Sequence, residues 1–140
     1  MKLLLAADGS EYTQKALKFI VAQKGLNSAQ SELLVVHVQP LLPTFLGVIL
    51  SVEKTMELQE VELEKVFSPI RKFLDKNNLK YRCIGLIGSV ANKIAAAAQE
   101  EHVNLIVMGT HGRDYLGSAV MGSVAQKVVA HSTVPVLLVK

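Results

Sequence analysis

Five short runs of apolar residues recur along the chain, separated by stretches of helical or polar character. The runs are apolar at nearly every position rather than at alternate positions, which is the pattern of strands covered on both faces of a sheet. Parallel sheets are covered in this way, because their own crossover helices pack on both faces. The predicted strands are Leu3–Ala7, Leu33–Val38, Cys83–Ile87, Leu105–Met108 and Val134–Val139.

Two of the stretches between these runs carry apolar stripes at helical spacing. Each stripe gives a helix one face that can pack on a sheet. Strands that alternate with helices predict an α/β layered fold, with a single five-stranded parallel sheet, helices on both of its faces and right-handed crossovers. The two stripes are Ala16, Leu17, Ile20 and Val21, and Val124, Ala125, Val128 and Val129.

Two segments depart from this simple alternation. Pro69 interrupts a helical pattern from about Glu53 to Lys76, so we expect that helix to be kinked or split near Phe67. The segment Pro40–Leu50 is unusually apolar for a connection. Its pattern fits a lid over a ligand or part of an interface, and it fits a short buried helix equally well.

Length and composition limit the kind of protein further. The 140 residues correspond to one domain, and 50% hydrophobic against 19% charged residues exclude disorder and a coiled coil. The longest mainly apolar stretch, Leu41–Leu50, is about half of what a membrane helix needs, and the apolar start is too short for a secretory signal. We therefore expect one domain over residues 1–140, located in the cytoplasm and making no membrane contact.

Charge and cysteine content exclude further classes. The single cysteine, Cys83, excludes an intrachain disulfide and a thiolate-rich metal site. The net charge of +3 is spread along the chain, which does not favour a nucleic-acid partner. The four histidines make no metal cluster, and we expect His37, inside an apolar run, to be a hydrogen-bonded core or strand-end residue.

A long glycine-rich loop follows the fourth predicted strand. Gly109 ends that strand, Gly112 follows in a turn, and Gly122 precedes the last helix. Such spacing lets main-chain amides surround an anion, and Arg113 offers a countercharge. Ordered loops of this length are uncommon unless they are functional. The alternative is that the loop needs glycines for positive φ angles, whatever it binds.

The end of this loop also carries a helix-start signal. Ser123 is followed three residues later by Gln126, the spacing of a capping box, so we expect Ser123 to be the N-cap. A helix N-terminus presents free amides and a partial positive charge, which suits a phosphate.

These motifs resemble those of the universal stress protein family, over essentially the whole chain. Nucleotide-binding members carry a glycine, two residues, a glycine, nine residues, and a glycine followed by Ser or Thr, which Gly109, Gly112, Gly122 and Ser123 match without a gap. The resemblance extends to Asp8 at the end of the first strand and to Val38 at the end of the second. It implies a Rossmann-like fold of the adenine nucleotide alpha hydrolase-like type, in the branch that binds ATP.

The resemblance also implies roles for these residues. Asp8 would bind the ribose or adenine side, Val38 would meet the adenine through its main chain, and the glycine loop with Ser123 would hold the phosphates. The implied cofactor is ATP, or AMP or ADP, with or without Mg²⁺, and no dedicated metal ligands are evident. The expected site comprises Ala7, Asp8, Val38, Met108, Gly109, His111, Gly112, Arg113, Gly122, Ser123 and Val124.

The ligand position bears on the order of the strands. Ligands of open α/β sheets lie beyond the carboxyl ends of the strands, where the strand order reverses. If Asp8 and Gly109 touch one ligand, the first and fourth strands are neighbours. This favours the order 3-2-1-4-5 over the flavodoxin-like order 2-1-3-4-5. Taken alone, an aspartate before Gly-Ser is also a common turn or cap residue.

Several functions stay compatible with the sequence. We favour a regulatory module of the stress response that holds ATP or AMP and changes its surface or partner accordingly, with at most weak ATPase activity. The chain has no Walker motif, so a slow ATP hydrolase with His111 or Arg113 near the phosphates is a second hypothesis. A dimeric interaction protein that binds no nucleotide is a third. A phosphoacceptor receiver is disfavoured, because the third strand ends in Ile87-Gly88 rather than in an aspartate.

The last strand bears on assembly. Val134–Val139 is apolar at nearly every position, which would leave a sticky edge in a monomer, and Pro135 is tolerated at such an edge. Members of the family pair this strand antiparallel across a two-fold axis, so we expect a homodimer. The alternative is an edge shielded by a helix of the same chain.

Overall fold

The computed structural model describes residues 1–113, 115, 117 and 119–140, and for residues 46–48 it describes the main chain only. The described elements form one five-stranded parallel sheet in the order β3-β2-β1-β4-β5, as predicted. In chain order the elements are β1 (Lys2–Ala6), α1 (Glu11–Ala22), β2 (Glu32–Gln39), α2 (Thr44–Ile49), α3 (Val52–Lys76), β3 (Tyr81–Ile87), α4 (Val90–Glu100), β4 (Leu105–Gly109), α5 (Ser123–His131) and β5 (Val136–Val139).

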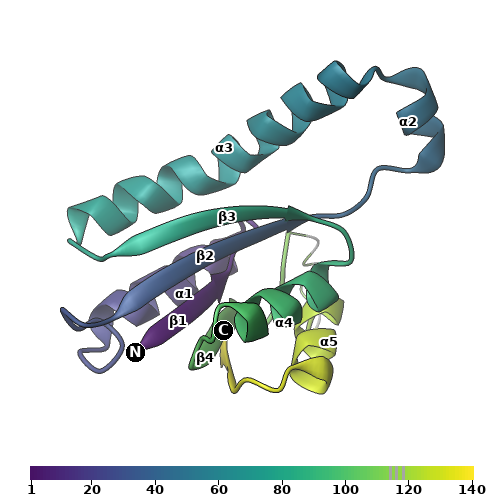
Figure 1. Cartoon of the computed structure of the whole chain (residues 1–140). Coiled ribbons are helices and arrows are strands. Elements are labelled where there is room, and N and C mark those ends of the chain that lie inside the picture. Colours follow the sequence, from purple (N-terminus) through teal and green to yellow (C-terminus); the bar gives the residue numbers. More distant parts are fainter. Residues whose placement is uncertain (114, 116, 118) are drawn as a thin grey trace.

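Helices cover the sheet on both faces, with α1 and α3 on one side and α4 and α5 on the other (Figure 1). The central strand β1 shows why its sequence is apolar throughout. Leu3 and Leu5 pack into the core beneath α1 and α3, whereas Leu4 packs into the core beneath α4 and α5. All three side chains are fully buried, so neither face of the strand tolerates a polar residue.

The two predicted helical stripes differ in outcome. In α1, Ala16, Leu17 and Ile20 are fully buried, as predicted. In α5, Ala125 and Val128 are buried, but Val129 is 47% exposed, so its assignment to the stripe is wrong. Val129 lies about 100° round the helix from Val128, at the edge of the face that packs on the sheet.

The start of α5 also differs from the prediction. Gly122 is the N-cap and Ser123 is the first helical residue, without a side-chain cap. The Gln126 side chain donates to the Met121 carbonyl instead of closing a capping box. A capping box needs its serine in the extended position before the helix, and here Gly122 occupies that position.

The helix with the internal proline is not split. It runs for 25 residues as α3, with Pro69 inside it. Proline removes only one main-chain donor, and buried residues on both sides of it, Val66, Phe67 and Ile70, anchor the helix on the sheet. Tertiary packing therefore outweighs the local preference of Pro69.

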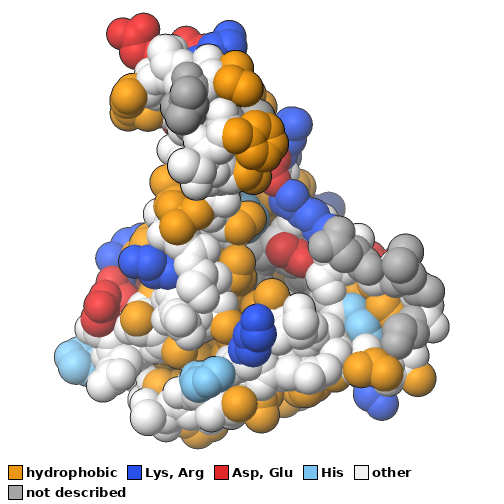
Figure 2. Space-filling view, turned by 90° about the vertical axis from the view of Figure 1, so that its right-hand side faces the viewer, with side chains coloured by type: hydrophobic (Ala, Val, Ile, Leu, Met, Phe, Trp, Pro, Cys, Tyr) orange, Lys and Arg blue, Asp and Glu red, His pale blue; other side chains and the backbone are white. Residues whose placement is uncertain are grey.

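The apolar connection does form a short helix, α2, but the expectation that it is buried is wrong. Phe45 and Ile49 are 64% and 72% exposed, and α2 with the first half of α3 projects away from the sheet (Figure 1). Figure 2 shows hydrophobic side chains on this projecting part. No helix among the described residues is both long enough and apolar enough to cross a membrane.

Candidate functional site

A cavity of about 640 Å³ opens at the carboxyl ends of β1, β2 and β4, next to the first turns of α4 and α5. The strand order runs outward from β1 in both directions, to β2 on one side and to β4 on the other. The cavity lies at this switch point, where open α/β sheets bind ligands. Its volume is in the range of small-molecule sites. Every residue that the sequence predicts for the site lines it: Ala7, Asp8, Val38, Met108, Gly109, His111, Gly112, Arg113, Gly122, Ser123 and Val124.

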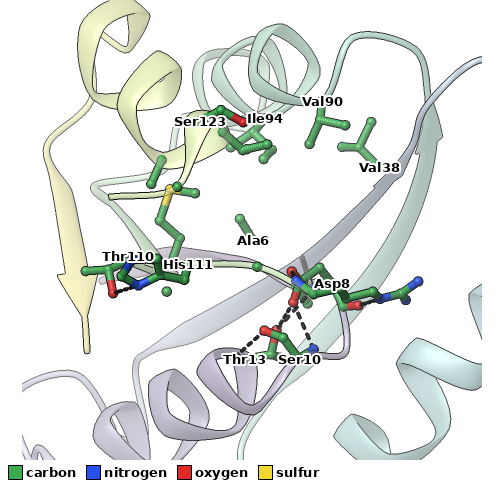
Figure 3. A pocket seen from close by; sticks show the side chains of 18 of the residues that line it. Ala6, Asp8, Ser10, Thr13, Val38, Val90, Ile94, Thr110, His111 and Ser123 are labelled. Atoms are coloured by element: carbon green, nitrogen blue, oxygen red, sulfur yellow. Dashed lines mark hydrogen bonds between the residues drawn. The ribbon is translucent and has the colours of Figure 1, made fainter. Parts of the chain in front are cut away.

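One side of the cavity is apolar. Val38 from β2 and Val90 and Ile94 from α4 lie together on this side, with Ala6 of β1 at the base (Figure 3). Val90 and Ile94 are absent from the predicted site, although the Gly88-Ser89 pair before them marks the start of α4. An apolar wall of this kind suits a flat, largely apolar ring system.

The opposite side is organised by Asp8, directly after β1. Its Oδ1 accepts hydrogen bonds from the Ser10 amide and the Thr13 hydroxyl, both at 2.9 Å. Its Oδ2 accepts a hydrogen bond from the Arg113 amide at 3.1 Å. A carboxylate has about four acceptor positions, so one on Oδ2 stays open to a further donor. Asp8 is thus the turn residue that the sequence allows, and it also connects β1 to the glycine loop.

The Arg113 side chain does not point to the end of the cavity where α5 begins. Its Nε donates to the Asp8 carbonyl, and its guanidinium pairs with the Glu62 carboxylate of α3 at 2.5 Å. This hydrogen bond lowers the pKa of Glu62 below its ordinary value, against the opposing effect of burial. The sequence gives no signal for Glu62, because the contact joins residues 51 positions apart.

His111 has partners at both ring nitrogens. Nε2 lies 2.7 Å from the Val120 carbonyl, and Nδ1 lies 2.9 Å from the Thr110 hydroxyl. A carbonyl only accepts, so Nε2 carries the hydrogen and Nδ1 accepts from Thr110. The ring forms a three-membered cluster with the rings of Tyr12 and Tyr115, at centroid distances of 5.2 and 4.3 Å. His111 is therefore a structural member of the loop, not a free base.

The three motif glycines of the loop, Gly109, Gly112 and Gly122, are required for space rather than for positive φ. Positive φ among the described glycines occurs at Gly9, Gly88 and Gly117, and not at the three motif positions. A Cβ at Gly109 would lie 2.4 Å from the Tyr12 Cβ, and one at Gly112 would lie 2.7 Å from the Asp8 Oδ2.

At Gly122 the close neighbour is the main chain. A Cβ there would lie 3.2 Å from the Thr110 carbonyl oxygen, which accepts the Gly122 amide at 2.8 Å. The start of α5 is thus held close to the end of β4. Its first amides have no side-chain cap and lie beside the cavity, where Ser123 is also placed (Figure 3).

His37 is a hydrogen-bonded core residue, as predicted. It is 5% exposed, and its Nδ1 lies 2.8 Å from the Ala7 carbonyl. That acceptor places the hydrogen on Nδ1, and the buried Nε2 has no hydrogen-bond partner among the described residues. Within the segment 40–50, Pro40 is the one side chain among those described that lines the cavity.

Comparisons with known proteins agree with this architecture. Residues 1–140 match the sequence model of the Universal stress protein family. Universal stress protein MJ0577 of Methanocaldococcus jannaschii is 31% identical over 155 residues, covering 99% of this chain and 94% of that protein. The universal stress protein in the QAH/OAS sulfhydrylase 3′ region of Thermus aquaticus is 36% identical over 138 residues, covering 99% and 97%.

Solved structures give the same result for the fold. The structure of MJ0577 matches with a TM-score of 0.82 at 30% identity, covering 99% of this chain and 94% of that one. A universal stress protein family protein from Arabidopsis thaliana, solved with AMP bound, matches with a TM-score of 0.73 at 15% identity, covering 100% and 91%. Universal stress proteins in complex with cAMP and with dAMP match at 16% and 21% identity, with TM-scores of 0.71 and 0.64. Sequence model, relatives and fold together establish that this chain belongs to the universal stress protein family.

Proposed function

We propose that this protein binds an adenine nucleotide in the cavity between β1, β4 and the starts of α4 and α5, and that it acts as a regulatory module of the stress response. The observation that carries the proposal is the convergence of the predicted residues. The predicted site residues come from short motifs far apart in the sequence, and all of them line one cavity at the switch point of the sheet.

The chemistry of the walls suggests how the nucleotide lies. The adenine ring fits between the apolar side chains of Val38, Val90 and Ile94, where it is removed from water. The ribose lies beside Asp8, whose Oδ2 keeps one acceptor position for a sugar hydroxyl. This orientation places the phosphates toward the glycine loop.

The phosphate end is formed by main-chain groups rather than by side-chain charge. The first turn of α5 begins at Gly122 without a side-chain cap, so its amides are available to an anion. The partial positive charge of the helix N-terminus favours the same ligand. Gly122 and Gly112 carry no Cβ, which lets the loop pack directly against the Thr110 carbonyl and the Asp8 carboxylate beside this helix start.

The geometry favours binding over hydrolysis. Neither nitrogen of His111 is free to act as a base, because both are engaged. The described residues also offer no magnesium site of their own: no group of three His, Cys, Asp or Glu side chains gathers in that part of the chain, and the Asp8 carboxylate already accepts three hydrogen bonds. A magnesium ion would therefore take its ligands from the phosphates and from water.

Relatives of the same fold support the class of ligand. Proteins with this architecture have been solved with AMP, cAMP or dAMP, which share an adenine base and a single phosphate. Those three proteins are 15%, 16% and 21% identical to this chain and share its fold, and in this chain the cavity itself supplies the apolar wall and the free amides for such a ligand. Location in the cytoplasm stays a prediction from the sequence.

We further propose a homodimer through β5. This strand is at the edge of the sheet, and its four residues are all partly exposed. Among the described residues no strand pairs with its outer edge, and an apolar edge of this kind favours pairing with a second copy.

Calorimetric titration of the purified protein with AMP, cAMP, dAMP and ATP, with GMP as the comparison, tests the nucleotide proposal. We expect saturable binding of adenine nucleotides and a raised melting temperature, because a ligand that binds only the folded state stabilises it. The variant Val90→Trp places a larger side chain in the space beside the apolar wall of the cavity and should abolish binding. Val129→Trp makes the same change at an exposed position of α5 and should bind as the wild type does.

Absence of any binding or melting shift at millimolar adenine nucleotide would overturn the nucleotide proposal. It would leave the dimeric interaction protein as the function to pursue. Equal binding by Val90→Trp and Val129→Trp would place the ligand elsewhere on the molecule.

A further inference from the structure

The glycine loop contains one basic side chain, and the structure gives it another partner. Between Gly109 and Ser123 the sequence has no lysine and no arginine except Arg113. The Arg113 guanidinium pairs with Glu62 of α3 at 2.5 Å, and its Nε is held by the Asp8 carbonyl. Glu62 does not line the cavity, so the pair directs the positive charge out of it.

The Glu62 carboxylate is positioned to compete with a bound phosphate for the Arg113 guanidinium. The exposed fractions of the Arg113 and Glu62 side chains are 47% and 32%, so the pair sits at the cavity rim and not in the core. Arg113 itself lines the cavity, and its amide is fixed by the Asp8 carboxylate. Turning the guanidinium from α3 toward a bound phosphate chain would move the side chain of Arg113 and would leave its main-chain hydrogen bond to Asp8 in place.

From this arrangement we infer that Glu62 sets the preference of the site for the number of phosphates, by holding Arg113 away from the phosphate end. The inference rests on the nucleotide binding proposed above. Each additional phosphate adds negative charge, and while Arg113 is paired with Glu62 no other lysine or arginine of the loop is present to meet that charge at the start of α5. The site therefore suits adenosine monophosphates better than ATP.

The test compares AMP and ATP binding by calorimetry, at constant ionic strength and with EDTA present. The variant Glu62→Ala frees Arg113, and we expect it to tighten ATP binding on the order of fivefold, the scale of one exposed charge pair, with AMP affinity changed by less than about twofold. Glu60→Ala is the matched control, because it removes the same charge from an exposed position of α3. It should change neither affinity.

The double variant Glu62→Ala/Arg113→Ala separates release of Arg113 from simple removal of a negative charge. Its ATP affinity should equal that of Arg113→Ala alone. An ATP gain that persists in the double variant, or equal gains for AMP and ATP in Glu62→Ala, would overturn the inference while leaving nucleotide binding intact. If neither the wild type nor any variant binds AMP or ATP, the proposed function fails, and this inference fails with it.

Discussion

The Asp8 carboxylate, directly after the first strand, accepts a hydrogen bond from the main-chain amide of Arg113, 105 positions later. The same carboxylate also binds the Ser10 amide and the Thr13 hydroxyl at the start of α1. One side chain thus joins β1, α1 and the glycine loop on one side of the cavity. The shape of the site depends on this junction, whatever the ligand is.

Replacing Asp8 should cost both stability and binding. Asp8→Ala leaves three donors without their acceptor, so we expect the free energy of unfolding to fall by about 1–3 kcal/mol and nucleotide affinity to fall with it. Asp8→Asn retains one acceptor oxygen and the shape of the side chain, so its losses of unfolding free energy and of nucleotide affinity should be smaller. Urea denaturation and calorimetric titration measure the two effects. Unfolding of both variants at the wild-type urea concentration would show that the junction does not hold the loop.

Gly112 should not tolerate even one added methyl group. The Cβ of Gly112→Ala would lie 2.7 Å from the Asp8 Oδ2, so the loop or the carboxylate must move. We expect a loss of about 1–3 kcal/mol in unfolding free energy, together with weaker nucleotide binding. Gly25→Ala is the control, because its Cβ meets nothing within 4 Å, and its effect should stay within about 0.5 kcal/mol. Similar urea curves for the two variants would argue against the close approach at Gly112.

The Glu62 and Arg113 pair should add a small acid-sensitive term to stability. The pKa of Glu62 is lowered in the folded protein, chiefly by the hydrogen bond from Arg113. A carboxyl group with a lowered folded pKa stabilises the protein above its unfolded pKa, and this contribution is lost as the pH falls through the folded pKa. We expect less than about 1 kcal/mol, because the pair is partly exposed.

Urea denaturation between neutral pH and the range below 4.5, the ordinary pKa of Glu62, measures this contribution. Glu62→Gln should be less stable than the wild type at neutral pH and should approach it in acid. Glu60→Gln, on the same helix, should show no such convergence. If the offset of Glu62→Gln is the same at every pH, its origin is packing and not charge.

The proposed dimer makes a prediction about the main chain of β5. The carbonyls of Pro135 and Val139 face β4, where they accept amides of Ile106 and Thr110. Main-chain groups alternate sides along a strand, so those of Leu138 face the open edge. Leu138→Pro should therefore yield a monomeric mass by light scattering, whereas Leu138→Ala, which loses similar packing but keeps the amide, should remain dimeric. A dimeric Leu138→Pro protein would place the interface elsewhere.

The parallel sheet and the order of its strands could be predicted because both depend on features that are visible in the sequence. Continuous apolar runs record burial on both faces of the sheet, as in Leu3 to Leu5. The placement of Asp8 and Gly109 at strand ends fixes which strands are neighbours once both are assigned to one ligand. The start of the last strand differs from the prediction: the apolar run starts at Val134, but the strand starts at Val136.

The errors have a common cause, because they depend on tertiary packing. The exposure of Val129 does not follow from local pattern, nor does that of Phe45 and Ile49, and the pattern left open whether Pro69 kinks or splits its helix. The same holds for the site. Its glycines and Asp8 stand in recognisable motifs. Glu62 belongs to no motif and contacts Arg113, 51 positions away, and Thr13 belongs to no motif and binds the Asp8 carboxylate.

The central claim is that an adenine nucleotide occupies the cavity beside the glycine loop, and a ¹H–¹⁵N NMR titration with AMP tests it most directly. We predict saturable shifts of the amide signals of Gly112, Gly122, Ser123 and Val124, with the amides of Lys80 and Glu101, near the amino ends of the strands, unchanged. Shifts confined to residues outside the cavity, or no shifts at millimolar AMP, would contradict the account.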